Sequence, residues 1–296
     1  MTLGNPSVPG EVVVPRGVDR PPAVILLSGA GPNDLDETVG QTKPLRDIAY
    51  GLAEKGIASL RFDKPTRRGT PSSTFTPTEE YVGYSLAGFD LLASSNLVDT
   101  TRVFVLGHSF GGTMAPRVVA ARPEFAGVVL MAALAGELPD VLLRHFRHLT
   151  TLGGPLASAA AGQVGVAEDL RREITGALRR GVRMRSPLAH EAIGQGVTGS
   201  YFLDLRDYDA PAAAATLGAP ILILQGDRDY LVTVDDDLAR WTKALAGRDD
   251  VTVRRYPLAS HTMVDGQGVP TPEEYQIPGH VNPLVVDDIA EWVKGV

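Results

Sequence analysis

Short apolar runs rich in β-branched residues alternate along most of this chain with longer segments of helical periodicity. Most of these runs are hydrophobic at consecutive positions, which is typical of strands covered on both faces. A strand–helix–strand rhythm favours a parallel sheet with helices on both sides. We therefore predict an α/β fold with a doubly wound, mostly parallel sheet. The predicted strands are Glu11–Val14, Ala23–Leu27, Ala58–Phe62, Arg102–Leu106, Val128–Met131, Ile221–Leu224 and Val251–Tyr256. The predicted helices are Lys43–Glu54, Glu79–Ser95, Gly111–Ala121, Val234–Leu245 and Pro283–Val293.

One long segment interrupts this rhythm between the strand that ends near Met131 and the strand that starts at Ile221. It is rich in Ala, Arg and Leu, carries no strand pattern, and is divided by glycine and proline breaks at Gly153–Pro155, Gly181 and Ser186–Pro187. No long polar linker flanks it. We interpret residues 133–212 as a helical cap inserted within a single domain of residues 1–296.

Composition narrows the class of protein. The 296 residues are 44% hydrophobic and 21% charged, which is the balance of a folded domain. The net charge of −7 argues against a nucleic-acid partner. The absence of cysteine excludes disulfides and fits a reducing compartment. No signal-peptide pattern or membrane-length apolar run is visible, so we expect a cytoplasmic protein without a membrane span. The oligomeric state stays open.

A nucleophile motif follows the fourth predicted strand, in the run Gly107-His108-Ser109-Phe110-Gly111. An apolar strand leads directly into it and a helix of small residues leaves it. The residues two before and two after the serine must be small for strand and helix to approach each other in so sharp a turn. The turn exposes the Ser109 hydroxyl at a helix N-terminus, as in the nucleophile elbow of α/β-hydrolases. We interpret the adjacent His108 as a packed or hydrogen-bonded residue.

A serine nucleophile needs a base and an orienting carboxylate, which follow it in the order acid, then base in these folds. The buried strand at Ile221 opens into Gly226-Asp-Arg-Asp229, where Asp227 and Asp229 compete for the acid. The Gly-x-x-Asp spacing selects Asp229. The next strand ends in a loop that carries His261, the predicted base. The other downstream histidines lie in the cap or just before the last helix, where packing or surface roles are the simpler interpretation; they are His145, His148, His190 and His280.

Acyl transfer also needs amide donors for the developing oxyanion. The residue after the nucleophile, Phe110, supplies one amide. The glycine-rich loop Ser28–Pro32 after the strand Ala23–Leu27 places the second at Ala30. This loop lacks the spacing of a phosphate-binding loop. Lys64 also falls on the ligand side of the sheet, and we interpret it as a surface or salt-bridge residue.

These motifs carry a family resemblance. The runs Ser28-Gly-Ala-Gly-Pro-Asn-Asp-Leu-Asp-Glu-Thr-Val-Gly40 and Gly56-Ile-Ala-Ser-Leu-Arg-Phe-Asp-Lys64 resemble bacterial α/β-hydrolases of the esterase and acyl-peptidase-like kind, related to dienelactone hydrolases and the prolyl-oligopeptidase catalytic domain. The resemblance spans nearly the whole chain and implies a Ser109–Asp229–His261 triad under a helical cap. The chain departs from such relatives at Ser28, where they have His, and at Ser260-His261-Thr262-Met263, where they often read Asn-His-Leu-Phe.

Two features of the predicted cap bear on substrate choice. Tyr201, Phe202 and Tyr208 either line an acyl pocket or pack in the core. A group of arginines is either a solvated helix face or a set of charges that steers an anionic acyl substrate; its members are Arg171, Arg172, Arg179, Arg180, Arg183 and Arg185.

The sequence therefore predicts a serine hydrolase that acts on a small carboxylic ester, thioester or lactone through an acyl-enzyme on Ser109, with no metal or organic cofactor. Two alternatives stay open. The same triad would serve an acyltransferase, cyclase or thioesterase of a biosynthetic pathway, and a non-catalytic binding protein on the same fold is the second.

Overall fold

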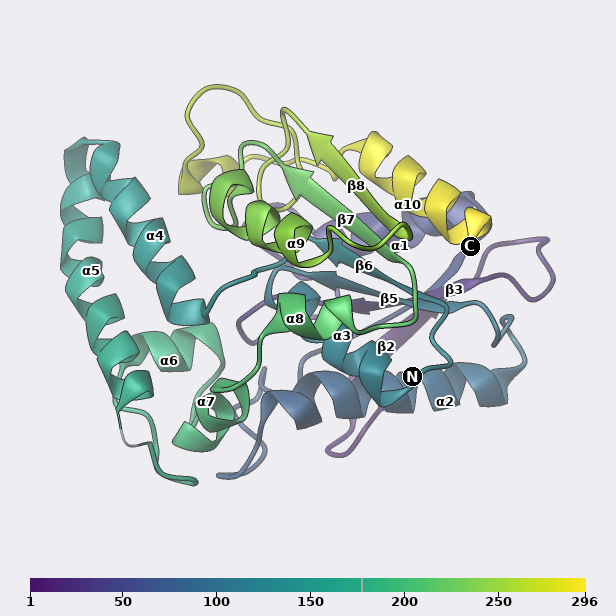
Figure 1. Ribbon diagram of the computed structural model, residues 1–296, viewed down its shortest axis with the longest axis horizontal. Helices are drawn as coiled ribbons and strands as arrows, with labels where there is room; N and C mark the ends of the chain where they lie inside the picture. Colours follow the sequence, from purple (N-terminus) through teal and green to yellow (C-terminus); the bar gives the residue numbers. More distant parts are fainter. Residues whose placement is uncertain (177) are drawn as a thin grey trace.

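The computed structural model describes residues 1–176 and 178–296 and contains one eight-stranded sheet. The strand order is β1-β2-β4-β3-β5-β6-β7-β8, and every pair from β4 to β8 along the sheet is parallel (Figure 1). The strands β1 and β2 complete one edge in antiparallel pairing. The bounds are β1 Thr2–Leu3, β2 Val8–Val13, β3 Ala23–Leu27, β4 Ala58–Phe62, β5 Val103–His108, β6 Gly127–Met131, β7 Ile221–Gly226 and β8 Val251–Tyr256. The predicted doubly wound, mostly parallel sheet is confirmed.

Helices cover both faces of this sheet. The first and last helices, α1 and α10, pack together on one face, while α2, α3 and α9 cover the other. Their bounds are α1 Pro44–Glu54, α2 Tyr84–Ser95, α3 Phe110–Ala121, α9 Ala239–Ala244 and α10 Pro283–Gly295. Short π-helical turns, η1 Thr78–Gly83 and η2 Val234–Leu238, lead into α2 and α9, and η3 Pro272–Gln276 is a 3₁₀ turn. The sequence predicts one continuous helix where the structure has η1 followed by α2, and another where it has η2 followed by α9.

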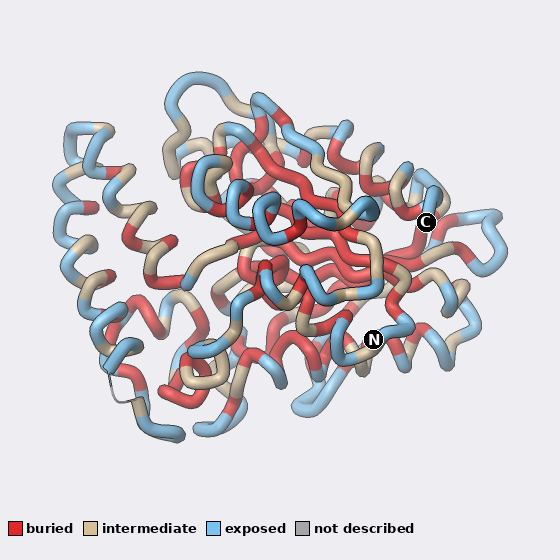
Figure 2. Tube along the Cα trace, in the orientation of Figure 1, coloured by how far each residue is buried: buried red, intermediate tan, exposed pale blue. Residues whose placement is uncertain are grey.

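The core explains why the strands are apolar at consecutive positions. In β3 the residues Ala23, Ile25 and Leu27 join the core beneath α2 and α3, whereas Val24 and Leu26 join the core beneath α1 and α10. Figure 2 shows these strands as a continuous buried layer in the middle of the molecule. Each side chain of such a strand is removed from water, so both faces must be hydrophobic.

The main correction concerns the N-terminal edge. We predict a strand at Glu11–Val14, but β2 runs from Val8 to Val13 and pairs with the short β1, which the sequence pattern does not predict. Pro9 and Gly10 interrupt the apolar pattern at the start of β2, and a two-residue strand is too short to show a period. The other strands and helices lie where the sequence predicts them, with ends shifted by up to two residues.

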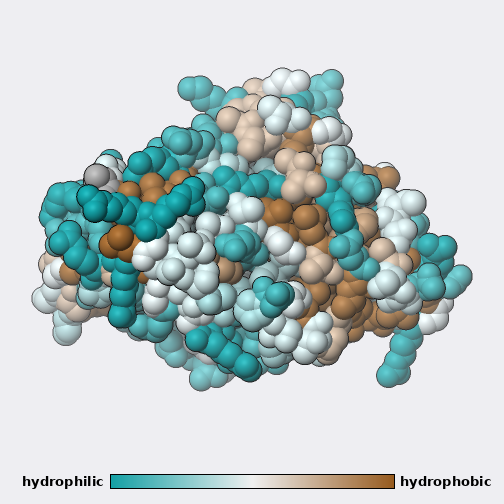
Figure 3. All heavy atoms as spheres, turned by 90° about the horizontal axis from the view of Figure 1, so that it is seen from below, coloured by the Kyte–Doolittle hydropathy of each residue, from teal (hydrophilic) through white to brown (hydrophobic). Residues whose placement is uncertain are grey.

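The segment between β6 and β7 is helical. It contains α4 Leu138–Thr151, α5 Gly154–Thr175, α6 Pro187–Ala192, α7 Gly199–Leu205 and α8 Ala210–Ala215. The predicted breaks at Gly153–Pro155 and Ser186–Pro187 fall at the starts of α5 and α6. The last helix, α8, crosses the predicted boundary at residue 212 and packs on α3. In Figure 1 the hairpin of α4 and α5 stands at the left end of the molecule, and Figure 3 shows mainly hydrophilic side chains at that end of the face seen from below. No helix in the described ranges is long and apolar enough to cross a membrane.

Candidate active site

Ser109 occupies a strained turn between β5 and α3. Its backbone has φ 53° and ψ −122°, in the positive-φ region that side-chain-bearing residues rarely adopt. The two flanking glycines permit this turn. A Cβ at Gly107 would lie 2.2 Å from the Gly111 carbonyl oxygen, and a Cβ at Gly111 would lie 2.5 Å from the Leu27 carbonyl oxygen. The local geometry is therefore that of the predicted elbow, held in place by contacts that only glycine allows.

Three side chains from different loops meet at this turn. The Ser109 Oγ lies 3.0 Å from His261 Nε2, and His261 Nδ1 lies 2.7 Å from Asp229 Oδ2. Asp229 follows β7 and His261 follows β8, so the parallel sheet brings them to the edge where β5 ends. Asp229 and His261 are buried, whereas Ser109 is partly open to solvent. The structure thus brings together the three residues that the sequence selects.

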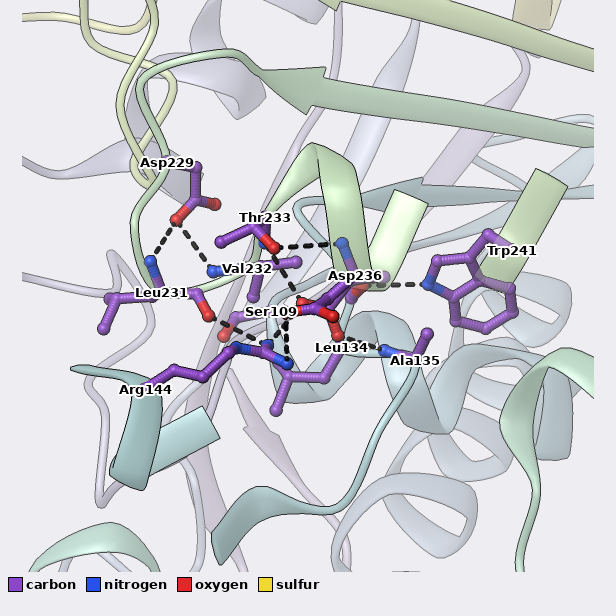
Figure 4. Close-up of polar contacts among 12 residues, drawn as sticks. Ser109, Leu134, Ala135, Arg144, Asp229, Leu231, Val232, Thr233, Asp236 and Trp241 are labelled. Carbon is purple, nitrogen blue, oxygen red and sulfur yellow. Dashed lines mark hydrogen bonds and ion pairs between the residues drawn. The ribbon is translucent and has the colours of Figure 1, made fainter. Parts of the chain in front are cut away.

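The carboxylate of Asp229 is fixed by its own loop. Its Oδ1 accepts hydrogen bonds of 2.9 Å from the backbone amides of Leu231 and Val232, which leaves Oδ2 for His261 (Figure 4). The competing Asp227 instead accepts a hydrogen bond from Arg255 Nε at 2.8 Å. The fixed carboxylate of Asp229 orients the His261 ring, so that Nε2 faces the Ser109 hydroxyl, as a general base must.

A residue of α4 holds the same loop from outside. Arg144 on α4 reaches across to donate to the Leu231 carbonyl at 3.2 Å (Figure 4). The same guanidinium makes an ion pair with the buried Asp237 of η2. Burial raises the pKa of Asp237, against the hydrogen bonds from Ala135 and Thr233 and the charge of Arg144, which lower it. Neither Arg144 nor Asp237 is predicted from the sequence, because their spacing along the chain is long and carries no motif.

The glycine-rich loop after β3 lies against the serine. A Cβ at Gly29 would lie 2.9 Å from Ser109 Cβ and 3.3 Å from its Oγ. The amides of Ala30 and Phe110 have no hydrogen-bond partner among the described residues. Two free amides therefore directly follow Gly29, which contacts Ser109, and Ser109 itself, at the positions that the sequence predicts for oxyanion donors.

A buried ion pair lies behind this loop. Glu37 Oε1 accepts a 2.5 Å hydrogen bond from the Gly29 amide and lies 2.9 Å from His108 Nδ1. His108 Nε2 lies 2.9 Å from the carbonyl oxygen of His261. Burial lowers the pKa of His108, but the charge and hydrogen bond of Glu37 outweigh this and the pKa is raised. The Nε2 atom is hydrogen-bonded to a carbonyl oxygen and Nδ1 lies beside a carboxylate, an environment that favours the imidazolium. His108 is hydrogen-bonded, as predicted, and Glu37 is a further residue that the sequence reasoning misses.

The histidines of α4 pack beside the acid loop rather than on the serine. The rings of His145 and His148 stack on Tyr230, with centroid distances of 5.6 Å and 4.6 Å. Burial, followed by the charges of His148 and His261, lowers the pKa of His145 to about 4. His190 and His280 contact the Met184 carbonyl and Asp47, respectively. These contacts are the packing and surface roles that the sequence predicts.

A cavity of about 630 Å³ opens beside Phe110, between α3 and the helices that follow β6. Phe202 and Tyr208 line it together with Thr113, and the Tyr208 hydroxyl donates to the Thr113 carbonyl at 2.9 Å. Tyr201 lies elsewhere. It is fully buried, does not line this cavity, and donates its hydroxyl to Glu80.

Several of the arginines between β6 and β7 pair with acids of the same segment. Arg171 lies 3.4 Å from Asp140, Arg185 lies 3.8 Å from Glu173, and Arg172 pairs with Asp169 one turn away. The side chains of the three arginines are more than half exposed. Arg171 and Arg172 lie on α5 and Arg185 lies in the loop before α6, and exposed pairs of this kind are typical of a solvated surface.

Known proteins are similar to this chain in sequence and in fold. The family described as "Serine aminopeptidase, S33" matches residues 42–266. Esterase EstD of Thermotoga maritima is 36% identical over 288 residues, which is 97% of this chain and 65% of that protein. A 2,6-dihydropseudooxynicotine hydrolase of Paenarthrobacter nicotinovorans is 28% identical over 122 residues, 41% of this chain and 31% of that protein. The chain thus spans about two thirds of the length of the first relative and less of the second.

Solved structures agree on the fold. A structure described as ferulic acid bound to Est1E of Butyrivibrio proteoclasticus has a TM-score of 0.64 at 16% identity and covers 100% of this chain and 98% of its own. An esterase of Pyrococcus furiosus has a TM-score of 0.61 at 16% identity, covering 99% and 89%. At these identities the likeness concerns the arrangement of the sheet and its helices.

Proposed function

Because this chain belongs to the serine aminopeptidase S33 family of α/β-hydrolases, we propose that it is a serine hydrolase of carboxylic esters. The observation that carries this proposal is the unbroken chain of contacts from Ser109 Oγ through His261 to Asp229, beside two free amides. The similarity to an esterase over 97% of the chain supports ester rather than other acyl substrates.

The reaction begins when His261 Nε2 takes the proton of Ser109 and the freed oxygen attacks the ester carbonyl carbon. The amides of Ala30 and Phe110 donate to the resulting oxyanion, and Asp229 stabilises the imidazolium. The carbon–oxygen bond of the ester then breaks, and His261 gives its proton to the leaving alcohol. Water repeats the sequence on the acyl-enzyme, releasing the acid and restoring the serine.

We propose that the 630 Å³ cavity beside Phe110 accepts the apolar part of a small-molecule substrate, with Phe202 and Tyr208 on its wall. Residues 133–212 then act as a cap over the site. Two contacts support this role: the Gly31 amide of the oxyanion loop donates to the Ala192 carbonyl, and Arg144 donates to the acid loop. Tyr201, on α7 in this segment, adds a third contact by donating a hydrogen bond to Glu80. The cytoplasmic location stays a prediction.

The sequence similarity to an esterase favours ester hydrolysis over the alternatives of a biosynthetic acyltransferase, cyclase or thioesterase. A panel of p-nitrophenyl esters, thioesters, lactones and aminoacyl anilides, run on the wild type and Ser109→Ala, tests this choice. The anilides are included because the family is described as a peptidase. We expect Ser109-dependent turnover to be fastest on esters.

A fluorophosphonate probe tests the nucleophile directly. We expect it to label wild-type protein at Ser109 and to leave Ser109→Ala unlabelled. If folded wild-type protein stays unlabelled while a control hydrolase reacts, the non-catalytic alternative is correct. If the label forms but the thioester or the anilide is the best substrate, the acyl-enzyme stands and the ester assignment is wrong.

A further inference from the structure

Lys64 is buried beneath the oxyanion loop. Of the two roles that the sequence predicts, it has the salt bridge, with Glu80, and not the surface position. It follows β4, and its side chain is 3% exposed. Its Nζ donates to the Gly29 carbonyl at 3.1 Å and to the Tyr81 hydroxyl at 2.8 Å, and lies 3.4 Å from Glu80 Oε1. Burial lowers the pKa of Lys64, against the charge of Glu80, which raises it. The three acceptors match the three N–H bonds of an ammonium group.

Lys64 and two neighbouring side chains all donate hydrogen bonds to the same peptide group. The Gly29 carbonyl oxygen accepts hydrogen bonds from Lys64, from the Tyr81 hydroxyl at 3.0 Å and from Asn33 Nδ2 at 3.1 Å. In a trans peptide the carbonyl and the amide of the next residue point in opposite directions. The three donors therefore hold the Ala30 amide facing away from them, where it is free to meet an oxyanion.

We propose that Lys64 is a positioning residue for oxyanion stabilisation, acting through the Gly29–Ala30 peptide. With Tyr81 it fixes the rotation of this peptide, and its positive charge on the carbonyl oxygen polarises the peptide so that the Ala30 amide is a stronger donor. This inference rests on the proposed function. It adds Lys64 as a residue that does not contact the substrate but sets how strongly the Ala30 amide donates to the oxyanion.

The neighbours of Lys64 show how such a charge is kept in the interior. Glu80 is 1% exposed, and its carboxylate also accepts hydrogen bonds from the Thr66 hydroxyl and from Tyr201 on α7. A buried cation is tolerated when it is paired and fully hydrogen-bonded. Glu80 therefore neutralises Lys64 and ties the network to the cap, while Lys64 alone of the pair reaches the loop.

The test must separate this role from simple stabilisation. Lys64→Met alone and Glu80→Gln alone each leave one charged group buried without its partner, which destabilises the fold. The double variant Lys64→Met/Glu80→Gln removes both charges, and its kcat is compared with that of Glu80→Gln per folded active site. A glutamine keeps an acceptor oxygen for one of the Thr66 and Tyr201 hydroxyls and can donate its NH2 group to the oxygen of the other, without the charge. Lys55→Met is the matched control, since Lys55 pairs with Asp287 on the surface.

Turnover of a p-nitrophenyl ester is measured per active site, counted by complete fluorophosphonate labelling. Relative to Glu80→Gln, we expect the double variant to lose about 10- to 100-fold in kcat, with KM within about threefold, because losing an oxyanion donor outright costs about 10²–10³. The inhibition constant of an aryl trifluoromethyl ketone, which forms a tetrahedral adduct on Ser109, should rise by the same factor. Lys55→Met should match the wild type.

A double variant whose kcat per site is within twofold of Glu80→Gln overturns the inference, as does a loss that lies entirely in KM. Either result leaves the proposed function intact if the wild type shows Ser109-dependent turnover. A wild type without such turnover refutes the proposed function itself, and the role of Lys64 with it.

Discussion

The buried pair of Glu37 and His108 makes the protein's stability depend on pH in a specific direction. The pKa of His108 is raised above its ordinary value near 6.5. The pair therefore contributes its full stability below about pH 6.5, and this contribution is lost as the pH rises through the native pKa of His108. The perturbation that tests this is Glu37→Gln, which removes the charge and keeps an oxygen acceptor for the Gly29 amide.

The magnitude follows from burial and distance. Both side chains are 3% exposed, and the atoms that face each other are 2.9 Å apart. Removing one partner of such a pair costs about 3–5 kcal/mol. Because glutamine retains the contact with Gly29, we expect the lower end, about 3 kcal/mol, at pH 5.5. In the variant the charge of Glu37 no longer offsets the burial of His108, so the imidazolium is disfavoured and the loss at pH 9 should be smaller than the loss at pH 5.5.

The measurement is urea unfolding of wild type and variant at both pH values, followed by the fluorescence of the buried Trp241. Glu54→Gln, on the exposed surface of α1, is the control and should stay within about 0.5 kcal/mol of wild type at either pH. A loss that is the same at pH 5.5 and pH 9 would show that the ionisation of His108 does not change between these pH values, and the reasoning would fail.

Three further predictions concern the elbow, the acid and the cap. Gly111→Ala should abolish the folded elbow and all turnover, because the new Cβ would lie 2.5 Å from a backbone oxygen. Gly162→Ala, in an open position on α5, should instead stabilise the protein by about 0.5–1 kcal/mol. Thermal melts and ester assays check both variants. Asp229→Asn should keep the fold and lower kcat by about 10³–10⁴-fold, and circular dichroism with ester kinetics distinguishes this from unfolding. Arg144→Met should cost about 3 kcal/mol in urea unfolding because Asp237 is left buried without its partner, and a loss under 1 kcal/mol would show that this contact is dispensable.

Much of the fold and the arrangement around Ser109 was predictable because the determinants are local. The glycines that flank Ser109 are required by contacts within one turn, and the strands are apolar because each is covered on both faces. The choice of Asp229 over Asp227 also follows from a short spacing. Such features are visible in a window of a few residues.

The residues that support the site were not predictable in this way. Lys64 meets Gly29 from 35 positions away, and Arg144 meets Asp237 from 93 positions away. Each is a charged residue whose burial depends on which element packs against it, and hydrophobic periodicity carries no information on that pairing. The sequence therefore indicates Lys64 as a surface or salt-bridge residue without identifying Glu80 as its partner or predicting its burial. The available signal was a lysine directly after a buried strand on the ligand side.

The buried pairs Glu37–His108 and Lys64–Glu80 both hold the loop that carries Gly29. Glu37 binds the amide of Gly29, and Lys64 binds its carbonyl, so opposite charges hold one glycine from its two sides. A loop of small residues has little side-chain packing to fix it, and glycine loses more conformational freedom on folding than any other residue. Charged partners replace that packing. Water in the same positions would relax after the oxyanion forms, whereas a fixed ammonium and carboxylate are oriented before the reaction starts. On this argument, the cost of burying four ionisable groups beside Ser109 is balanced by an oxyanion site that needs no rearrangement.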